Sequence, residues 1–401
     1  MEKLNRELVN KNSLLLWQGV GVSLFGDIIY NMAIAKCIYD MTESTLMVSI
    51  IAILNILPTI ILMPIAGVWV ERWQKKSVLI YSDLIRGLLM ILLGICFIFQ
   101  FNFALICVVS VLLGIAEAFF RPSIITLVPL IIKEKLLIRA SSITEVVSNT
   151  VTILANFIGG MLLLIFNIPV IIIFNGITFI ISAISELFIK VEEEKLDEEA
   201  KPLNYNFQEI KDSFATTKIF FHENKTYLGL LITYCTIVFL LSVYTILRLP
   251  FFESNFNIEL YGIAMGFISL GGIIAPILLS VIDIDKHKYQ VLLFAIIGMS
   301  IPMLFIGTKY AVIVVGIMFL YGFFNSILHN IFGVALVIGI PAEIRARISA
   351  INTPLILVSS LLGQLVGGIL GDIAPMDDII RCVFVIILLV VMINTRKLVK
   401  N

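Results

Sequence analysis

Long apolar segments recur along this 401-residue chain and limit what it can fold into. A helix that crosses a bilayer needs about 20 mostly apolar residues. Segments of about that length cover residues 14–38, 46–70, 78–99, 103–130, 142–166, 169–189, 226–249, 260–282, 289–308, 310–340, 347–371 and 379–395. Hydrophobic residues make up 60% of the chain and charged residues 14%, against roughly 45–50% and about 25% in soluble domains. We therefore expect an all-α polytopic membrane protein with twelve transmembrane helices.

The positions of the basic residues predict how these helices are oriented. Most of the 28 Lys and Arg residues lie at the termini and in the even-numbered connections, and short loops rich in Lys and Arg stay on the cytoplasmic side. We therefore expect a cell (plasma) membrane protein with both termini in the cytoplasm. Acidic residues also number 28, so no net charge favours nucleic acid as a partner. The Ile, Lys and Asn usage is typical of a bacterial source.

A polar stretch divides the apolar segments into two groups of six. We expect an N-terminal six-helix bundle over residues 1–190, a cytoplasmic linker over 191–225 and a C-terminal six-helix bundle over 226–401. The linker is either a solvated chain or carries a surface helix over residues 206–222. The fifth and eleventh segments contain matching glycine pairs, which are Gly159, Gly160, Gly367 and Gly368. We interpret them as helix-packing residues in two pseudo-symmetric halves, because repeated halves and small interfacial residues are common in transporters.

Motifs for other chemistry are not found in the sequence. The five cysteines form no CxxC pair, so neither a zinc site nor a disulfide framework is indicated. The sequence also contains no GxxxxGK[ST], HExxH or GxSxG motif. We therefore expect no enzyme activity, no metal and no cofactor.

The loop between the second and third segments carries a more specific signal. It reads GVWVERWQKK, with Gly67, Glu71, Arg72, Lys75 and Lys76 at the motif positions. This loop resembles the G-x-x-x-D-R-x-x-R-R gating loop of the major facilitator superfamily, with Glu in place of Asp and Lys in place of the distal arginines. The resemblance implies that the Glu71 carboxylate lies at the positive N-terminus of the eleventh helix.

The first segment points to one branch of that family. Ser23-Leu-Phe-Gly-Asp27, followed by Thr42-Glu-Ser44, resembles the S-x-x-G-D…T-x-S pattern of the twelve-span drug:proton antiporters, which include macrolide efflux proteins. The Gly-Pro of the fifth-span antiporter motif is replaced by Ala155-Asn156. The resemblance implies a monomer that exports amphiphilic drugs by alternating access, with the proton gradient as its energy source.

Ionisable residues inside the apolar segments are the candidates for coupling, because an unpaired charge in a bilayer is costly. Asp27 is predicted to bind a proton, with Ser23 and Asn31 on the same helical face as cavity residues; the alternative is a structural acid. Glu117 and Arg121 are four residues apart, either as a structural pair or as a proton-coupled switch.

A second group of charges lies nearer the cytoplasmic surface. Asp83, Arg86 and Glu145 are predicted to form an inner-gate charge network, with snorkelling to the interface as the alternative. Polar residues elsewhere in the segments are candidates to line the cavity, and these are Asn149, Asn325, His329 and Gln364. His329 has a second interpretation as a satisfied structural histidine.

Other functions stay open at this point. The same fold could move a dedicated metabolite, a siderophore or a lipid, or could serve as a non-transporting receptor or scaffold. A small polar solute would require convergent hydrogen-bonding groups in both halves, and the second half is mostly apolar. The sequence therefore favours an amphiphilic small molecule, together with protons and the lipid bilayer, as the partners.

Overall fold

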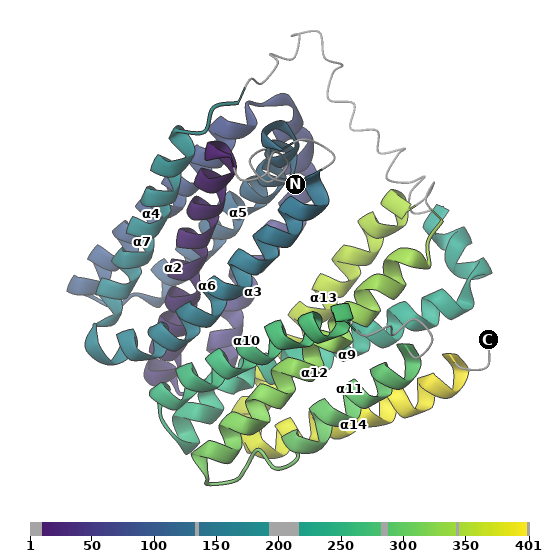
Figure 1. Ribbon diagram of the computed structural model, residues 1–401. Helices are drawn as coiled ribbons and strands as arrows, with labels where there is room; N and C mark the ends of the chain where they lie inside the picture. Colours follow the sequence, from purple (N-terminus) through teal and green to yellow (C-terminus); the bar gives the residue numbers. More distant parts are fainter. Residues whose placement is uncertain (1–9, 133–135, 192–215, 282–287, 342–344, 399–401) are drawn as a thin grey trace. The chain divides into compact units, whose positions relative to one another are not determined.

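The computed structural model describes residues 10–132, 136–191, 216–281, 288–341 and 345–398, and the regular structure in these ranges is α-helical (Figure 1). The first six long helices are α2 (Lys11–Thr42), α3 (Thr45–Arg72), α4 (Lys75–Phe99), α5 (Phe103–Ile131), α6 (Leu137–Ile165) and α7 (Ile168–Leu187). The next six are α9 (Lys225–Asn255), α10 (Ile258–Val281), α11 (Lys288–Met303), α12 (Ala311–Ile338), α13 (Arg345–Ile373) and α14 (Met376–Leu398). Each predicted segment therefore corresponds to one helix, and the all-α prediction is confirmed.

Length and hydropathy qualify most of these helices as membrane spans. Ten of the described helices are long and apolar enough to cross a bilayer, and α11 contributes a shorter apolar stretch, Gln290–Met303. Side-chain caps begin two of these helices, α2 and α5, because the first backbone N–H groups of a helix need acceptors. The Asn10 side chain accepts from the Ser13 amide at 2.9 Å, and the Asn102 side chain accepts from the Leu105 amide at 3.2 Å.

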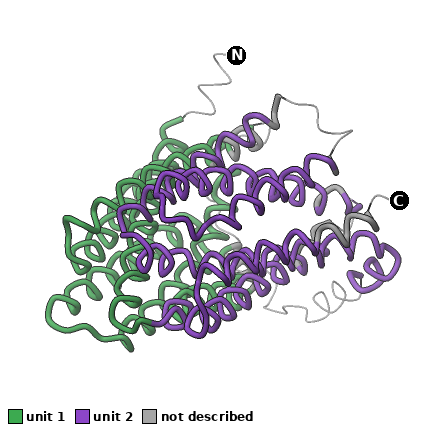
Figure 2. The backbone as a smooth tube through the Cα atoms, turned by 90° about the horizontal axis from the view of Figure 1, so that it is seen from below, with its two compact units in different colours: residues 1–43, 50–198 green, residues 44–49, 199–401 purple. Residues whose placement is uncertain are grey.

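The chain forms two compact units, coloured separately in Figure 2. Unit 1 comprises Met1–Glu43 and Ile50–Glu198, and unit 2 comprises Ser44–Ser49 and Glu199–Asn401. Residues 192–215, which make up much of the predicted linker, lie outside the described residues. Residues 216–223 are helical and join the core of unit 2, since the Phe220 and Tyr227 rings are 5.1 Å apart.

Glycines allow the helices of unit 1 to pack closely. Helices α4 and α7 meet at Gly87 and Gly176, where a Cβ on either glycine would lie 2.9 Å from the other's carbonyl oxygen. On α2, a Cβ at Gly26 would overlap the side chains of Asn175 and Thr178 on α7. Such contacts between backbones are characteristic of membrane helices, where small residues favour dispersion contacts between helices.

The predicted packing glycines also lie at helix contacts. A Cβ at Gly159 would approach Ile29 and Met32 of α2 at 3.2 Å, and Gly160 is buried. A Cβ at Gly367 would lie 2.8 Å from the Val243 carbonyl of α9.

The first turn of α3 is capped by an acidic residue of α13. The Asp372 carboxylate accepts from the Thr45 amide at 2.6 Å and from the Thr45 and Ser44 hydroxyls at 2.7 and 2.5 Å. A Cβ at Gly368 would come within 2.9 Å of Leu46 Cα, so the α13 backbone approaches this turn closely. These contacts explain why Ser44–Ser49 belongs to unit 2, whereas the rest of α3 belongs to unit 1.

We expect Gly322→Ala to destabilise unit 2, because a Cβ there would overlap the Ile268 backbone of α10. Overpacking of this kind costs about 1–3 kcal/mol. Gly316→Ala on the same helix is the matched control, since a Cβ at Gly316 meets nothing within 4 Å. Thermal unfolding in detergent should show a lower Tm for Gly322→Ala only, and equal Tm values for the two variants would contradict this account of the packing.

Candidate functional site

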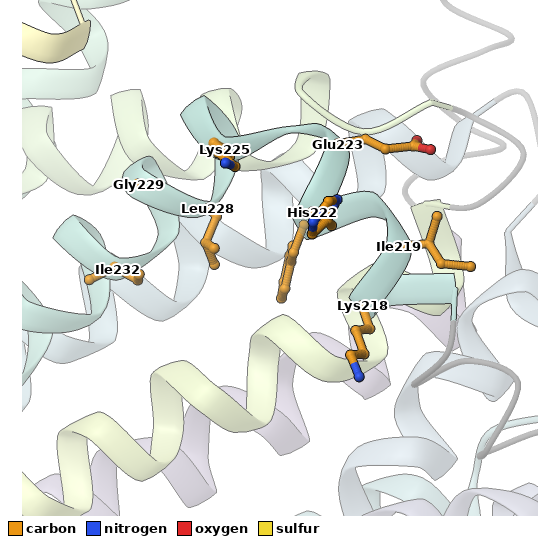
Figure 3. A pocket seen from close by; sticks show the side chains of 9 residues that line it. Lys218, Ile219, His222, Glu223, Lys225, Leu228, Gly229 and Ile232 are labelled. Atoms are coloured by element: carbon orange, nitrogen blue, oxygen red, sulfur yellow. The ribbon is translucent and has the colours of Figure 1, made fainter.

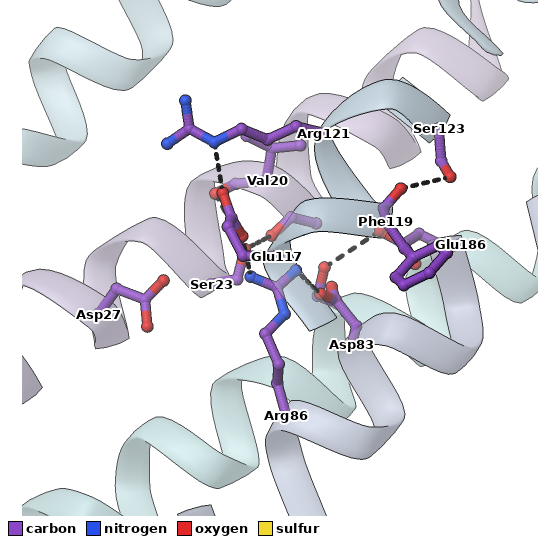
Figure 4. A network of polar contacts seen from close by, with 12 residues as sticks. Val20, Ser23, Asp27, Asp83, Arg86, Glu117, Phe119, Arg121, Ser123 and Glu186 are labelled. Atoms are coloured by element: carbon purple, nitrogen blue, oxygen red, sulfur yellow. Dashed lines mark hydrogen bonds and ion pairs between the residues drawn. The ribbon is translucent and has the colours of Figure 1, made fainter. Parts of the chain in front are cut away.

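A buried arginine lies at the centre of a charge cluster in unit 1 (Figure 4). Arg86 is 4% exposed and forms an ion pair with Asp83, which is fully buried and lies three residues earlier on α4. The i, i+3 spacing places both side chains on one helical face. Arg86 also donates to the Glu117 carboxylate of α5 at 2.7 Å. Two helices are therefore joined by one guanidinium.

Glu117 connects this buried pair to a more exposed arginine. Its second carboxylate oxygen accepts from Arg121 Nε at 2.6 Å, one turn along α5. The exposed fraction of the side chain rises from 5% for Arg86 to 25% for Glu117 and 62% for Arg121. The two charge groups predicted separately thus form one chain of alternating charge.

Aromatic rings surround the guanidinium of Arg86. Its Cζ atom lies 4.0 Å from the centre of the Phe120 ring and 4.6 Å from that of Phe179. A cation over a ring face is attracted by the ring's quadrupole, and the attraction is larger where water is excluded. The rings and the two carboxylates together offset the desolvation of Arg86, and its burial favours the charge network over snorkelling to the interface.

Asp27 lies in α2 beside the same cluster, as Figure 4 shows. Its Oδ1 accepts a hydrogen bond from the Asn175 side chain of α7 at 3.2 Å. Gly26 makes this contact possible, because a Cβ there would overlap Asn175. Asp27 forms no ion pair within the described residues.

Two residues of α2 that are predicted to line the cavity, Ser23 and Asn31, lie in different environments. Ser23 is buried in unit 1 and donates to the carbonyls of Gly19 and Val20 at 3.1 and 3.2 Å, whereas Asn31 is exposed. In this structure Ser23 is therefore engaged by its own helix, and its role in lining a cavity stays a prediction. A helical serine readily bonds to its own backbone, and the packing of α7 on α2 covers this position.

Two polar residues of α7 belong to the cluster but are missing from the sequence-based candidates. Asn175 contacts Asp27, and Glu186 is fully buried near Asp83. Glu186 lies in the last turn before the polar stretch, where an acidic residue is expected to be solvated. The spacing of Asn175, Ser182 and Glu186, at i, i+7 and i+11 on one helical face, was the available signal.

The gating loop is described only in part. The side chains of Gly67, Glu71, Arg72 and Glu145 lie outside the described residues, so the expected contacts of Glu71 and Glu145 stay predictions. Lys76 donates to the Leu187 carbonyl at 2.9 Å. A lysine at this position satisfies a carbonyl at the end of α7 and interacts favourably with the helix dipole.

The candidates in other helices are dispersed. His329 Nδ1 lies 2.8 Å from the Tyr234 hydroxyl, which supports the structural interpretation of this histidine. The buried side-chain oxygen of Asn325 has no hydrogen-bond partner among the described residues, Gln364 is half-buried, and Asn149 of unit 1 is exposed.

A hollow of about 870 Å³ lies in unit 2, where residues 216–223 meet the start of α9 (Figure 3). It is lined by Lys218, Ile219, Phe221, His222, Glu223, Lys225, Leu228, Gly229 and Ile232. None of the predicted site residues is among these lining residues.

We expect Arg86→Met to destabilise unit 1 strongly, because it leaves the buried Asp83 carboxylate without its cation. Breaking a buried ion pair on one side costs about 3–5 kcal/mol. Arg381→Met is the matched control, since Arg381 pairs with Asp377 and Asp378 at an exposed site, where ion pairs contribute about 1 kcal/mol or less. Similar losses of Tm in the two variants would contradict a special role for the buried pair.

Comparisons with known proteins agree with this architecture. The family profile described as Major Facilitator Superfamily matches residues 16–364. Macrolide efflux protein A of Streptococcus pyogenes is 24% identical over 219 residues, which are 54% of this chain and 53% of that protein. The Enterococcus faecalis protein of the same name is 23% identical over 188 residues, which are 46% and 56% of the two chains. The alignments thus span about half the length of the curated relatives.

Solved structures extend the likeness to the whole chain. A mutant of the nucleoside transporter NupG aligns with a TM-score of 0.72 at 12% identity, covering 98% of this chain and 99% of that chain. A bacterial homologue of the iron transporter ferroportin, in an inward-facing state, aligns with a TM-score of 0.70 at 14% identity, covering 98% of each chain. At these identities the likeness shows the fold alone, and the profile match decides the family. The chain is a multi-span membrane transporter that belongs to the major facilitator superfamily.

Proposed function

We propose that this protein is a secondary transporter that exports amphiphilic small molecules in exchange for protons. The observation that carries the proposal is Asp27, a carboxyl within membrane span α2 that contacts the Asn175 amide and no cation of the described residues. An acidic residue inside a span is costly unless it is paired, wet or protonated. A site that can lose its charge by binding a proton fits this environment.

The charge chain of unit 1 suggests how a proton could act on the transporter. Arg86 pairs with Asp83 and Glu117, and Glu117 also holds Arg121. A proton on Asp27 would change the local field at Arg86 and thereby the balance of these ion pairs. A proton and a substrate that favour different access states would then be coupled, because each shifts the equilibrium by its differential affinity.

The proposed substrate class rests on the chemistry of the helices and on the macrolide efflux relatives. Among the candidates in unit 2, His329 is engaged by Tyr234, which leaves Asn325 and Gln364 as neutral polar groups. Such a set offers few directional contacts to a small polar solute and suits a large, mostly apolar molecule. The macrolide efflux proteins are named for export of such molecules.

The proposed direction of transport combines the predicted orientation of the protein in the membrane with an inward movement of protons. With both termini in the cytoplasm, as the Lys and Arg distribution predicts, α2 begins at the cytoplasmic face of the cell membrane. Protons that move inwards through unit 1 would then drive the substrate outwards.

We expect Asp27→Asn to abolish proton-driven transport, because Asn keeps the polar side chain near Asn175 but has no carboxyl to protonate. The assay is proton-driven accumulation of ethidium or Hoechst dye in inside-out vesicles, with a pH-sensitive probe for proton movement. The mutant signal should fall to that of vesicles without the protein. Asp40→Asn is the matched control, since Asp40 lies on the same helix in a surface ion pair with Lys36 and is exposed.

The outcomes separate the rival functions. Full proton-driven dye transport by Asp27→Asn would contradict the proposed role of Asp27 in proton coupling. Wild-type protein that moves no dye would contradict export of amphiphilic drugs and favour a dedicated solute or a receptor role. Dye movement that ignores the proton gradient would contradict proton coupling while keeping the substrate class.

A further inference from the structure

Glu186 is a buried acid that pairs with no cation of the described residues. Its side chain is fully buried in the last turns of α7. One carboxylate oxygen lies 3.4 Å from the Ser182 hydroxyl, and the other has no hydrogen-bond partner in the part of the chain that the structure describes. Ionised carboxylates without partners are rare in protein interiors because desolvation opposes their charge. The environment of Glu186 therefore calls for a further ligand.

Asp83 stands on the other side of the same hydroxyl. It is fully buried, lies close enough to Ser182 and Glu186 to interact with both, and is paired with Arg86, while its Oδ2 has no hydrogen-bond partner among the described residues. Two buried carboxyl groups thus lie beside one serine. Gly19 of α2 allows this approach, since a Cβ there would lie 2.9 Å from Ser182 Oγ and 3.6 Å from Glu186 Oε1.

The charged groups around Asp83 and Glu186 do not neutralise the charge that the two acids would carry if both were ionised. On α4, Arg86 divides its contacts between Asp83 and Glu117, while Lys76 donates to the Leu187 carbonyl. Helix α2 carries no charged side chain between Lys11 and Asp27, and α6 carries none from residue 146 to residue 165. With both acids ionised, Asp83, Glu186 and Arg86 would leave one uncompensated negative charge in the protein interior.

The hydrogen bonds also indicate that one of the two acids carries a proton. A serine hydroxyl has one proton, so it can donate to only one of two carboxylates, and it turns lone pairs towards the other. Two like charges at one site cannot both stay ionised at low cost, as in other carboxyl pairs that share a proton. A single proton on Glu186 resolves both problems. Its O–H then donates to Ser182 Oγ, and the Ser182 O–H donates to the Asp83 carboxylate.

We propose that Glu186 binds a proton and is linked through Ser182 to an ionised Asp83, whose charge Arg86 compensates. For transport the inference rests on the proposed proton coupling, to which it adds a second proton-binding carboxyl besides Asp27. The binding of the proton itself does not depend on what the protein transports. It can therefore be tested without a substrate.

The test is infrared spectroscopy of the full-length protein in lipid at neutral pH, with and without 13C-labelled glutamate. We expect a carbonyl-stretch band of a protonated carboxylic acid that shifts with the glutamate label. The band should be lost in Glu186→Gln and kept in Glu223→Gln, which changes an exposed glutamate. A wild-type protein without a label-sensitive band, or a band kept in Glu186→Gln, would overturn the proposal.

A second variant keeps the proposal testable if Glu186→Gln does not fold. Ser182→Ala keeps both acids but removes the acceptor of the proposed O–H, so the band should move to higher frequency as that hydrogen bond is lost. An unmoved band in this variant would also overturn the proposal. Dye transport in the same samples separates the two proposals, because a protonated Glu186 in a protein that moves no dye would leave this inference intact and contradict the proposed function.

Discussion

The desolvated guanidinium of Arg86 is the constraint around which the polar interior of unit 1 is arranged. A buried cation in a bilayer requires counter-charges, and Asp83 and Glu117 supply them from α4 and α5. The rings of Phe120 and Phe179 cover its faces. The planar guanidinium suits this combination, since it stacks on rings while its edge reaches two carboxylates. Lysine has a compact charge and could not serve all four neighbours.

Close helix packing makes that arrangement possible. Gly87 and Gly176 bring the backbones of α4 and α7 together, and Gly19 and Gly26 do the same for α2 and α7. Without these glycines, the acids on three helices would lie too far apart to interact. The same residues that supply dispersion contacts in the membrane therefore also set the electrostatics of the site. In this unit the positions of the charged side chains therefore depend on the close packing of the helices.

The sequence predicted the helices and the ion pairs within one helix. It did not predict the contacts between helices. The apolar segments located each long helix of the described residues, and the i, i+4 spacing predicted the Glu117–Arg121 pair. The Arg86–Glu117 contact joins residues on different helices, and nothing in either helix alone indicates it.

The burial of single polar side chains is also beyond what the sequence shows. Whether Ser23 and Glu186 are buried depends on which face of α2 and of α7 is covered. Hydropathy gives little help here, since lipid-facing and buried positions are both apolar in a membrane helix. Polar residues at helical spacing on α7 were the one available clue, and the acidic stretch that follows that helix concealed it.

The cap that Asp372 places on the first turn of α3 has a consequence for local stability. A continuous helix normally opens as one unit, but Ser44–Ser49 is held by α13, whereas the following turns pack within unit 1. Amide hydrogen exchange reports such local opening residue by residue. The amides of Leu46 to Ser49 should exchange in step with those of α13, and the amides beyond Ile50 in step with those of α5, which the later turns contact. One helix would then show two protection levels, with the change near residue 50.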